Sequence, residues 1–192
     1  EIRQTISQLR HGPAFTAAAV VILGLGLGVT LYMYTVVKAY MLTPLPYPGA
    51  DRIMHIERAN PLHGQDSLEV TQHDFVDWRR AQTSFEDLAA FYVGTVNLSG
   101  GDLPERVEGA FITPSAFEVV KEDAHLGRTL VPEDGRPGAP PVIILGYDTW
   151  LNRYNGDPGI LGDTIRVNGV PTTVVGVMPA GFRFPDRGVD LW

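Results

Sequence analysis

Apolar residues form one long uninterrupted run near the N-terminus and only short, spaced segments elsewhere. From Pro13 to Val37 there are 25 residues without a charged side chain. An α-helix rises about 1.5 Å per residue, so this run extends about 38 Å. A bilayer has a hydrocarbon core of about 30 Å, which about 20 apolar residues cross. The pattern therefore predicts a transmembrane helix within residues 13–42.

Three glycines alternate within this run, at Gly24, Gly26 and Gly28. A dinucleotide-binding fingerprint needs its third glycine at position 29, which is occupied by Val29. A P-loop needs a lysine directly after its last glycine, but the first lysine after these glycines is Lys38. The spacing therefore excludes both phosphate loops. Gly24 and Gly28 lie one helical turn apart on the same face, where small residues let another helix approach in lipid. They are the candidate helix-packing residues.

The flanks of the run indicate how the helix is anchored. A signal peptide has an apolar core of about 7–15 residues before a small-residue cleavage site, whereas this run is longer and bulky residues follow it. Arg3, Arg10 and His11 precede the run against a single acid, Glu1. The excess of basic residues predicts a cytoplasmic N-terminus. We expect an anchor in a bacterial inner membrane, contacting the lipid bilayer, with the later residues periplasmic or otherwise extracytoplasmic.

The first twelve residues form a separate cytoplasmic segment in this interpretation. Ile2, Ile6 and Leu9 recur at helical spacing with polar residues between them. The pattern predicts a short amphipathic helix on the cytoplasmic membrane face. An ordinary cytoplasmic helix packed on a partner fits the pattern equally well.

The part of the chain that follows the helix has the composition of a folded, water-exposed domain. Residues 43–50 are rich in proline and read as a linker, and residues 51–192 form the predicted domain. From position 39 onward there are 12 basic and 21 acidic residues, a net charge of −9. This balance argues against nucleic-acid binding, which needs basic patches. The absence of cysteine excludes a disulfide framework.

Several short patterns predict the elements of this domain. Arg52–Arg58 alternates like a strand. Thr71 and Thr83, each followed three residues later by an acid, predict capping boxes that open two helices, the second through Phe85–Phe91. Two strand-like segments, residues 92–99 and 105–112, resemble a β-hairpin, and Thr113-Pro114 predicts the start of a short helix.

The last third of the chain repeats this mixture of signals. Residues 141–145 predict a strand, residues 147–154 a helix, and Asp157-Pro158 a helical turn. Asn168-Gly169, flanked by two apolar segments, predicts a tight hairpin. Recurring hairpins between helices indicate an α+β fold with a mixed or antiparallel sheet, not a doubly wound parallel one. The predicted fold class is thus one transmembrane helix followed by a mixed α/β extracytoplasmic domain with β-hairpins.

Residues that bear chemistry are few and scattered. Glu69, His73 and Asp77 recur every four positions and would align three metal-ligand types on one helix, but a helix capped by Thr71 excludes Glu69. We therefore favour a solvated helix face over a metal site. Phe75 and Trp78 are interpreted as core anchors. No catalytic signature such as G-x-S-x-G or H-E-x-x-H occurs, and no cofactor is expected.

Two further motifs have structural readings. Asn97-Leu98-Ser99 matches a glycosylation sequon, but as part of the predicted hairpin it is interpreted as strand sequence. Arg128 stands near Glu133 and Asp134. A structural ion pair at a turn explains this spacing.

In order along the chain, five segments resemble the N-terminal part of the MacB-like and FtsX-like ABC transporter permeases, and most closely the duplicated orphan permeases. They are QLRHGPAFTAAAVVILGLGLGVTLYMYTVVKAYMLTPLPYPGADRI, DFVDWRRAQTSFEDLAAF, NLSGGDLPERVEGAFIT, LGRTLVPED and GDPGILGDTIRVNGVPTTVVGVMPAGFRFP. The resemblance covers nearly the whole chain. It implies a first transmembrane helix that leads into a periplasmic core domain, with further transmembrane helices later in the polypeptide.

The resemblance also implies a function and partners. Such permeases contain no ATPase, and a cytoplasmic ABC ATPase subunit or domain supplies ATP hydrolysis. We therefore expect a non-enzymatic segment that relays ATP-driven conformational change to the extracytoplasmic domain, for export or an envelope function. The other permease helices or a second permease copy are the expected partners in the membrane. The alternative is a membrane-anchored extracytoplasmic enzyme or sensor, which a cluster of titratable residues in a deep pocket would favour.

Overall fold

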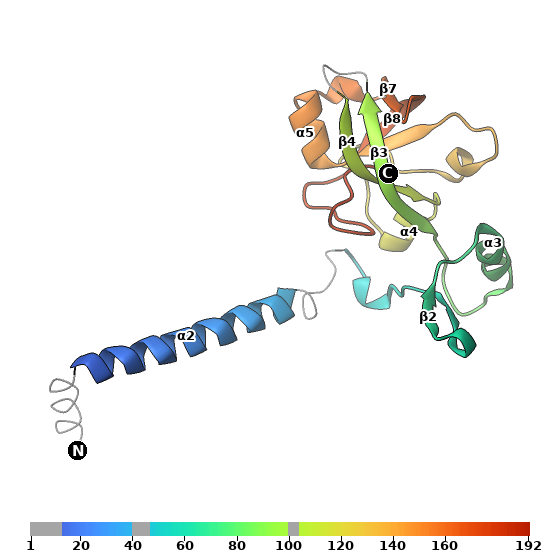
Figure 1. Cartoon of the computed structure of the whole chain (residues 1–192). Helices are drawn as coiled ribbons and strands as arrows, with labels where there is room; N and C mark the ends of the chain where they lie inside the picture. The colour runs from blue at the N-terminus through green and yellow to red at the C-terminus, as the bar shows by residue number, and fades with distance from the viewer. Residues whose placement is uncertain (1–12, 40–46, 100–103) are drawn as a thin grey trace. The chain divides into compact units, whose positions relative to one another are not determined.

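A computed structural model describes residues 13–39, 47–99 and 104–192 (Figure 1). The chain divides into two compact units, Glu1–Leu45 and Pro46–Trp192, and each is described by itself. The amphipathic segment predicted for residues 1–12 lies outside the described residues, as do the linker residues 43–46. The boundaries predicted for the cytoplasmic segment, the helix, the linker and the domain therefore remain predictions.

The first unit contains the helix α2, which runs from Pro13 to Val37 and coincides with the uncharged run. Its residues Ala14–Val37 have a mean hydropathy of 2.2, and none of the stretch is buried in the structure. Two hydroxyl groups bond back to the helix: Thr30 Oγ1 donates to Gly26 O and Thr35 Oγ1 to Leu31 O, both over 2.8 Å. Lipid offers no partner for a hydroxyl, so these bonds suit a membrane. The helix is long and apolar enough to span a bilayer.

The second unit is built on a mixed sheet. The strands are β3 (Phe91–Ser99), β4 (Glu105–Ile112), β5 (Leu126–Gly127), β6 (Val142–Leu145), β7 (Thr164–Val167) and β8 (Val170–Val177). Antiparallel pairing joins β4 to β3, β3 to β7 and β7 to β8, and β8 also pairs with β5 antiparallel and with β6 parallel. The predicted α+β class with a mixed sheet and recurring hairpins is confirmed.

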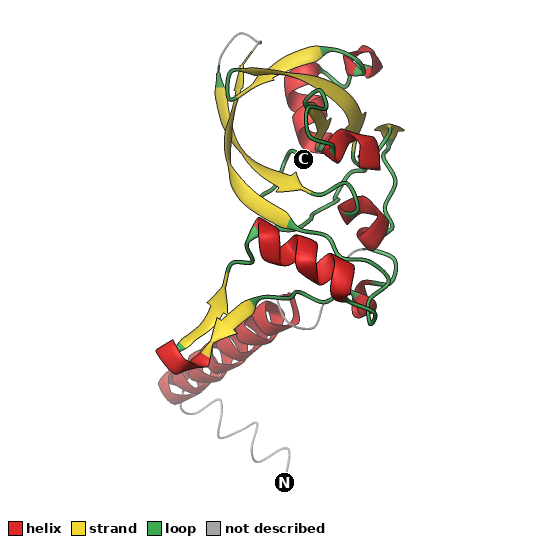
Figure 2. Cartoon of the chain, turned by 90° about the vertical axis from the view of Figure 1, so that its right-hand side faces the viewer, coloured by secondary structure: helices red, strands yellow, loops and turns green. Residues whose placement is uncertain are grey.

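Asp190–Trp192, called the closing segment below, closes this sheet into a ring. Leu191 bridges Gly109 of β4 in parallel and Leu145 of β6 in antiparallel fashion. Ala110 N donates to Leu191 O over 2.8 Å, while Ile144 and Trp192 exchange two backbone hydrogen bonds of 2.8 and 3.0 Å. The strands accordingly curve around a common centre (Figure 2). Closing the ring satisfies backbone groups that two edge strands would otherwise leave open.

Successive side chains of a strand point to opposite faces of the sheet, and the buried side chains accordingly form two clusters. One contains Leu98, Ile143, Leu145 and Leu191, together with Trp150 of the helix α5 (Tyr147–Tyr154). The other cluster contains these residues: Tyr47, Ala110, Phe117, Val120, Ile144, Met178, Phe182, Val189 and Trp192. Because neighbouring residues such as Leu191 and Trp192 point to opposite faces, the closing segment contributes to both clusters.

The local signals of the C-terminal half are confirmed. The helix α5 spans Tyr147–Tyr154, and the 3-10 turn η5 spans Pro158–Ile160 with Asp157 at its N-cap. Asn168 and Gly169 both have positive φ, 52° and 80°, as the tight hairpin turn requires. The helix α4 spans Ala116–Val120, so it starts two residues later than Thr113-Pro114 predicted.

The part of the second unit that precedes β3 differs more from its prediction. It contains the 3-10 turn η2 (Ala50–Arg52), the hairpin of β1 (Arg58–Asn60) and β2 (Gln65–Leu68) around η3 (Pro61–His63), and the helix α3 (Gln72–Ala81). The strand predicted for Arg52–Arg58 is wrong. Pairing begins only at Arg58, where Leu68 of β2 lies opposite.

The helix predicted for Phe85–Phe91 is also wrong. The side chain of Gln82 accepts the Phe85 N–H over 2.9 Å, and the Glu86 carboxylate binds Arg52 over 2.7 Å instead of folding back onto a helix end. Asp87 accepts from Arg79 and from the N–H of Leu88. Arg52 therefore takes the Glu86 carboxylate that a capping box would have used.

The loop between β5 and β6 is held by the ion pair expected from its sequence. The guanidinium group of Arg128 donates to both carboxylate oxygens of Asp134, over 2.6 and 3.0 Å. Asp134 lies in the 3-10 turn η4 (Pro132–Gly135) and also accepts the Val131 N–H over 2.9 Å. The hydrogen bonds from Arg128 lower the pKa of Asp134. Glu133 pairs instead with Arg136, and both of those side chains are exposed.

Replacing Asp134 and Glu133 one at a time distinguishes an ion pair that stabilises the loop from an ion pair that is exposed to solvent. We expect Asp134→Ala to lower the free energy of unfolding by about 2 kcal/mol, because hydrogen bonds to charged groups are the stronger kind. The control Glu133→Ala should stay within about 0.5 kcal/mol. Chemical denaturation of the detergent-solubilised chain measures both.

The ion pair of Arg128 and Asp134 also makes the free energy of unfolding depend on pH. A lowered pKa means that the folded state binds fewer protons, so the contribution of Asp134 is present at neutral pH. It should be lost as the pH falls below about 4, the ordinary carboxyl value. Equal losses for the two variants, or an acid sensitivity unchanged by Asp134→Ala, would contradict this assignment.

Candidate functional site

The first candidate surface is the glycine face of α2. A methyl group placed at Gly24 or Gly28 would meet no atom within 4 Å, and the same holds for Gly26. Within the described residues this face is therefore uncovered and open to a helix of another segment or chain. The role of Gly24 and Gly28 in helix packing remains a prediction.

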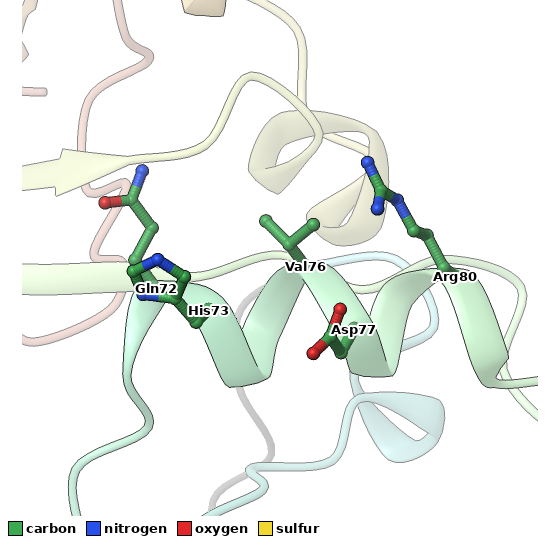
Figure 3. Close-up of a pocket in the computed structure, with 5 residues that line it drawn as sticks. All are labelled: Gln72, His73, Val76, Asp77 and Arg80. Carbon is green, nitrogen blue, oxygen red and sulfur yellow. The ribbon is translucent and has the colours of Figure 1, made fainter.

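The second candidate is a shallow hollow along α3. It has a volume of about 350 Å³ and is lined by Gln72, His73, Val76, Asp77 and Arg80 (Figure 3). Gln72, Val76 and Arg80 project from one face of the helix, at the spacing expected of successive turns. His73 and Asp77 form the neighbouring pair that the sequence had placed on one face.

The structure does not bring the three predicted ligand types together on that helix. The Thr71 cap is confirmed, because its hydroxyl oxygen accepts the Asp74 N–H over 3.3 Å. Glu69 therefore precedes the helix, where its backbone carbonyl accepts from Arg58 Nε over 3.1 Å. Among the described residues no group of three or more His, Cys, Asp or Glu side chains is placed to hold a metal ion. His73 and Asp77 alone offer fewer protein ligands than metal sites commonly use.

The aromatic residues of α3 are also placed differently from the prediction. Phe75 and Trp78 are only partly buried, and α3 contributes no residue to the buried core. The helix is instead tied down by ion pairs: Arg58 with Asp74 over 2.7 Å, and Arg79 with Asp87 over 3.0 Å. The interpretation of Phe75 and Trp78 as core anchors is wrong.

The third candidate is an apolar groove of the ring, which the sequence did not reveal. It has a volume of about 410 Å³ and lies between β4 and the start of β6. Phe111, Ile112, Leu130, Val142, Val170 and Trp192 are among the residues that line it. These residues are far apart in the sequence, and no local motif marks them.

The groove offers little acid–base chemistry. Its titratable lining residue is Asp134, whose two oxygens already accept from Arg128 and from Val131. The described lining therefore contains no pair of acid and base groups that a hydrolytic or proton-transfer reaction requires.

One acidic region lies where the closing segment enters the ring. Burial raises the pKa of Asp190, and the nearby carboxylates of Asp148, Glu105 and Glu108 act in the same direction, while Arg183 opposes them. Burial likewise raises the pKa of the Tyr47 hydroxyl, which donates to Arg183 O over 2.8 Å. The backbone of Asp190 is part of the ring, because its N–H donates to Glu108 O of β4 and its carbonyl accepts from Gly146 N, directly after β6.

Comparisons with known structures show the same fold. One is the crystal structure of the periplasmic region of MacB from Actinobacillus actinomycetemcomitans, with a TM-score of 0.54 and 16% identity over 70% of this chain and 60% of that one. Another is the extracellular domain of the noncanonic ABC-type transporter YknZ from Gram-positive bacteria, with a TM-score of 0.50 and 19% identity over 59% of each chain. The chain thus spans about 60% of the length of these structures. No curated protein matches.

A family model supports a more specific conclusion than the fold. The model of the MacB-like periplasmic core domain matches residues 16–190, which is most of the chain and includes nearly all of α2. That core domain and the apolar helix together indicate a membrane-anchored protein with an extracytoplasmic domain. The chain belongs to the MacB-like periplasmic core domain family, a component of ABC transporter permeases.

Proposed function

We propose that this chain is the N-terminal part of a MacB/FtsX-type permease, which relays ATP-driven conformational change from a cytoplasmic ATPase to an extracytoplasmic domain. The observation that carries the proposal is the coupling, in one chain, of a bilayer-length helix to a MacB-like periplasmic core domain. The domain acts in export or in another envelope function. It is a mechanical part and not an enzyme.

ATP hydrolysis is proposed to come from a separate or fused nucleotide-binding domain, since residues 1–192 contain no phosphate loop. The glycines of α2 have the wrong spacing for one, and their helix is uniformly apolar. YknZ, whose extracellular domain has the same fold, is a noncanonic ABC-type transporter, which supports a partner of this class. The partner is thus a cytoplasmic ABC ATPase subunit or domain.

The two units suit a relay. Backbone pairing and two buried clusters make the second unit cohesive, so a displacement of its N-terminal end moves the whole body. Helix α2 runs without a break from Pro13 to Val37, so one element would span the bilayer. The proline-rich residues 43–50 are proposed as the connection, since proline restricts the backbone and stiffens a linker.

The orientation follows from charge. Arg3 and Arg10 precede α2, and basic residues concentrate on the cytoplasmic side of membrane helices. The N-terminus therefore lies in the cytoplasm, and the second unit lies outside a bacterial inner membrane. The acidic net charge of that unit suits a water-exposed location.

Thiol labelling in intact cells tests this orientation, and residues 1–192 contain no cysteine that would compete with an introduced one. Leu62 is 93% exposed at the tip of the first hairpin. We expect a membrane-impermeant maleimide to label Leu62→Cys in intact cells and to label Ser7→Cys only after the cells are opened. The reverse pattern would overturn the topology.

Substitutions on α2 test the membrane contact. Gly24→Ile or Gly28→Ile should weaken cross-linking to the other permease helices or to a second copy about fivefold, or about 1 kcal/mol, because close approach is lost. Gly26→Ile, on another side of the helix, is the matched control and should do less. Insertion should survive in all three, since isoleucine is favourable in lipid. Equal, negligible effects would remove the proposed packing role.

Spin-label distances test the relay itself. Labels at Val37→Cys and Leu62→Cys report the end of α2 and the second unit, in the native permease reconstituted with its ATPase. We expect their distance distribution to shift by more than about 2 Å between ADP and trapped ATP states. A pair within the second unit, Tyr92→Cys with Leu151→Cys, should not change. An unchanged Val37–Leu62 distance during active ATP hydrolysis would contradict the relay and favour an anchored enzyme or sensor.

A further inference from the structure

Tyr47 is the first described residue of the second unit, and its side chain is already part of the core. It is 7% exposed and belongs to the buried cluster that contains Trp192. Between Tyr47 and Val96 every residue is at least partly exposed. The chain therefore enters the unit at a residue fixed inside the core, and the residues that follow it lie at the periphery until β3.

The side chain of Tyr47 is held by residues 182–184. Its hydroxyl donates to Arg183 O over 2.8 Å, across 136 positions of sequence. Its ring centre lies 6.0 Å from that of Phe182 and 6.2 Å from that of Phe184, the second pair in an edge-to-face arrangement. Aromatic pairs at such separations stabilise a fold beyond the area that they bury. One hydrogen bond and two ring contacts thus join Tyr47 to three successive residues.

The same three residues hold the closing segment. Trp192 Nε1 donates to Phe184 O over 2.6 Å. The ring centre of Trp192 also lies 5.2 Å from that of Phe182. Residues 182–184 therefore contact Tyr47 on one side and the segment that closes the ring on the other.

Residues 182–184 are also tied to a helix of the unit. The guanidinium group of Arg183 donates to Phe182 O over 2.8 Å and to Asp148, at the start of α5, over 3.2 Å. Close-packed interiors transmit strain instead of absorbing it. A displacement of Tyr47 is therefore passed on to α5 and to the closing segment.

A displacement that comes from α2 has two routes into the second unit. Covalent continuity leads through residues 48–90, where neither η2 nor α3 contains a buried residue. The ion pair of Arg52 with Glu86 on this route is largely exposed, and exposed ion pairs contribute little free energy. The contacts of Tyr47 lead directly into the core. The route through Tyr47 is therefore the stiffer of the two.

We propose that Tyr47 is the anchor at which displacement enters the second unit. It fixes the incoming chain to residues 182–184, and these residues pass the displacement on to the closing segment, so that the first hairpin and α3 are bypassed. The transmission rests on the proposed relay function, whereas the anchor is a property of the fold alone. Tyr47 is thus a positioning residue that acts through residues 182–184.

The mobility of a spin label tests the anchor without nucleotide. A label at Asp51→Cys, in the turn η2 that follows Tyr47, reports how firmly the entering chain is held in the native permease. We expect Tyr47→Ala to shorten the rotational correlation time of this label at least about twofold, and Tyr47→Phe, which loses only the hydroxyl bond, to shorten it less. Tyr92→Ala is the matched control, since Tyr92 is 62% exposed, and should have no effect.

A label at Asp51→Cys that is as immobile in both Tyr47 variants as in the wild type would overturn the anchor. The distance between labels at Tyr92→Cys and Leu151→Cys shows whether each variant is folded. If Tyr47→Ala does not fold, Tyr47→Phe decides. Increased mobility at Asp51→Cys then supports the anchor, and wild-type mobility contradicts it.

Distances between α2 and the core test the transmission, with labels at Val37→Cys and Leu151→Cys in the native permease reconstituted with its ATPase. We expect a shift of more than about 2 Å between ADP and trapped ATP states, of which Tyr47→Ala loses at least about half and Tyr92→Ala loses none. Equal shifts in the wild type and in Tyr47→Ala would overturn this route and leave the relay standing. No shift in the wild type would contradict the proposed function, and the Asp51→Cys label would then decide on the anchor.

Discussion

The backbone pairing of Asp190–Trp192 with both β4 and β6 is the interaction on which the architecture of the second unit depends. It joins β4, which ends at Ile112, to β6, which begins at Val142. The bonds run between Ala110 and Leu191 and between Ile144 and Trp192. Without it β4 and β6 would present open edges, which proteins normally cover or pair. Because Leu191 and Trp192 also belong to different buried clusters, the same three residues hold the sheet closed and connect both cores.

This closure has a consequence for function. Because Asp190–Trp192 pairs with β4 and with β6, a displacement of one strand is passed to the other, which suits the proposed role of transmitting displacement. The ion pairs of the second unit are placed accordingly: the pair of Arg128 and Asp134 fixes a loop beside the groove, and Arg58 and Asp74 fix α3. Neither pair is directed into a deep pocket with other titratable groups. The proposed relay in a permease follows from this cohesion and from the membrane-length helix.

Features with a local cause were predictable from the sequence. The uncharged run gave the bounds of α2, Thr71 gave the start of α3, and Asn168-Gly169 gave the turn between β7 and β8. The pairing of Arg128 with Asp134 was predictable for the same reason, since the two residues are close in sequence. Each of these signals depends on neighbours within a few positions.

Features that depend on distant partners were not predictable. The second capping pattern failed because Arg52, which lies 34 positions earlier, takes the Glu86 carboxylate. Arg52–Arg58 alternates like a strand but has no partner before Arg58. The groove could not be predicted, because β4, β6 and the closing segment come together only in the folded ring. None of the three segments contains a local motif that indicates the groove.

Native-state hydrogen exchange tests the dependence on ring closure most directly. The amides of Ala110, Ile144 and Gly146 donate to the closing segment, whereas other amides cross between β3 and β4 within one hairpin. If closure holds the second unit together, both sets should exchange only through global unfolding and give the same free energy of opening. A clearly lower free energy for Ala110, Ile144 and Gly146 would show that the ring opens while the β3–β4 hairpin stays folded, and would contradict this account.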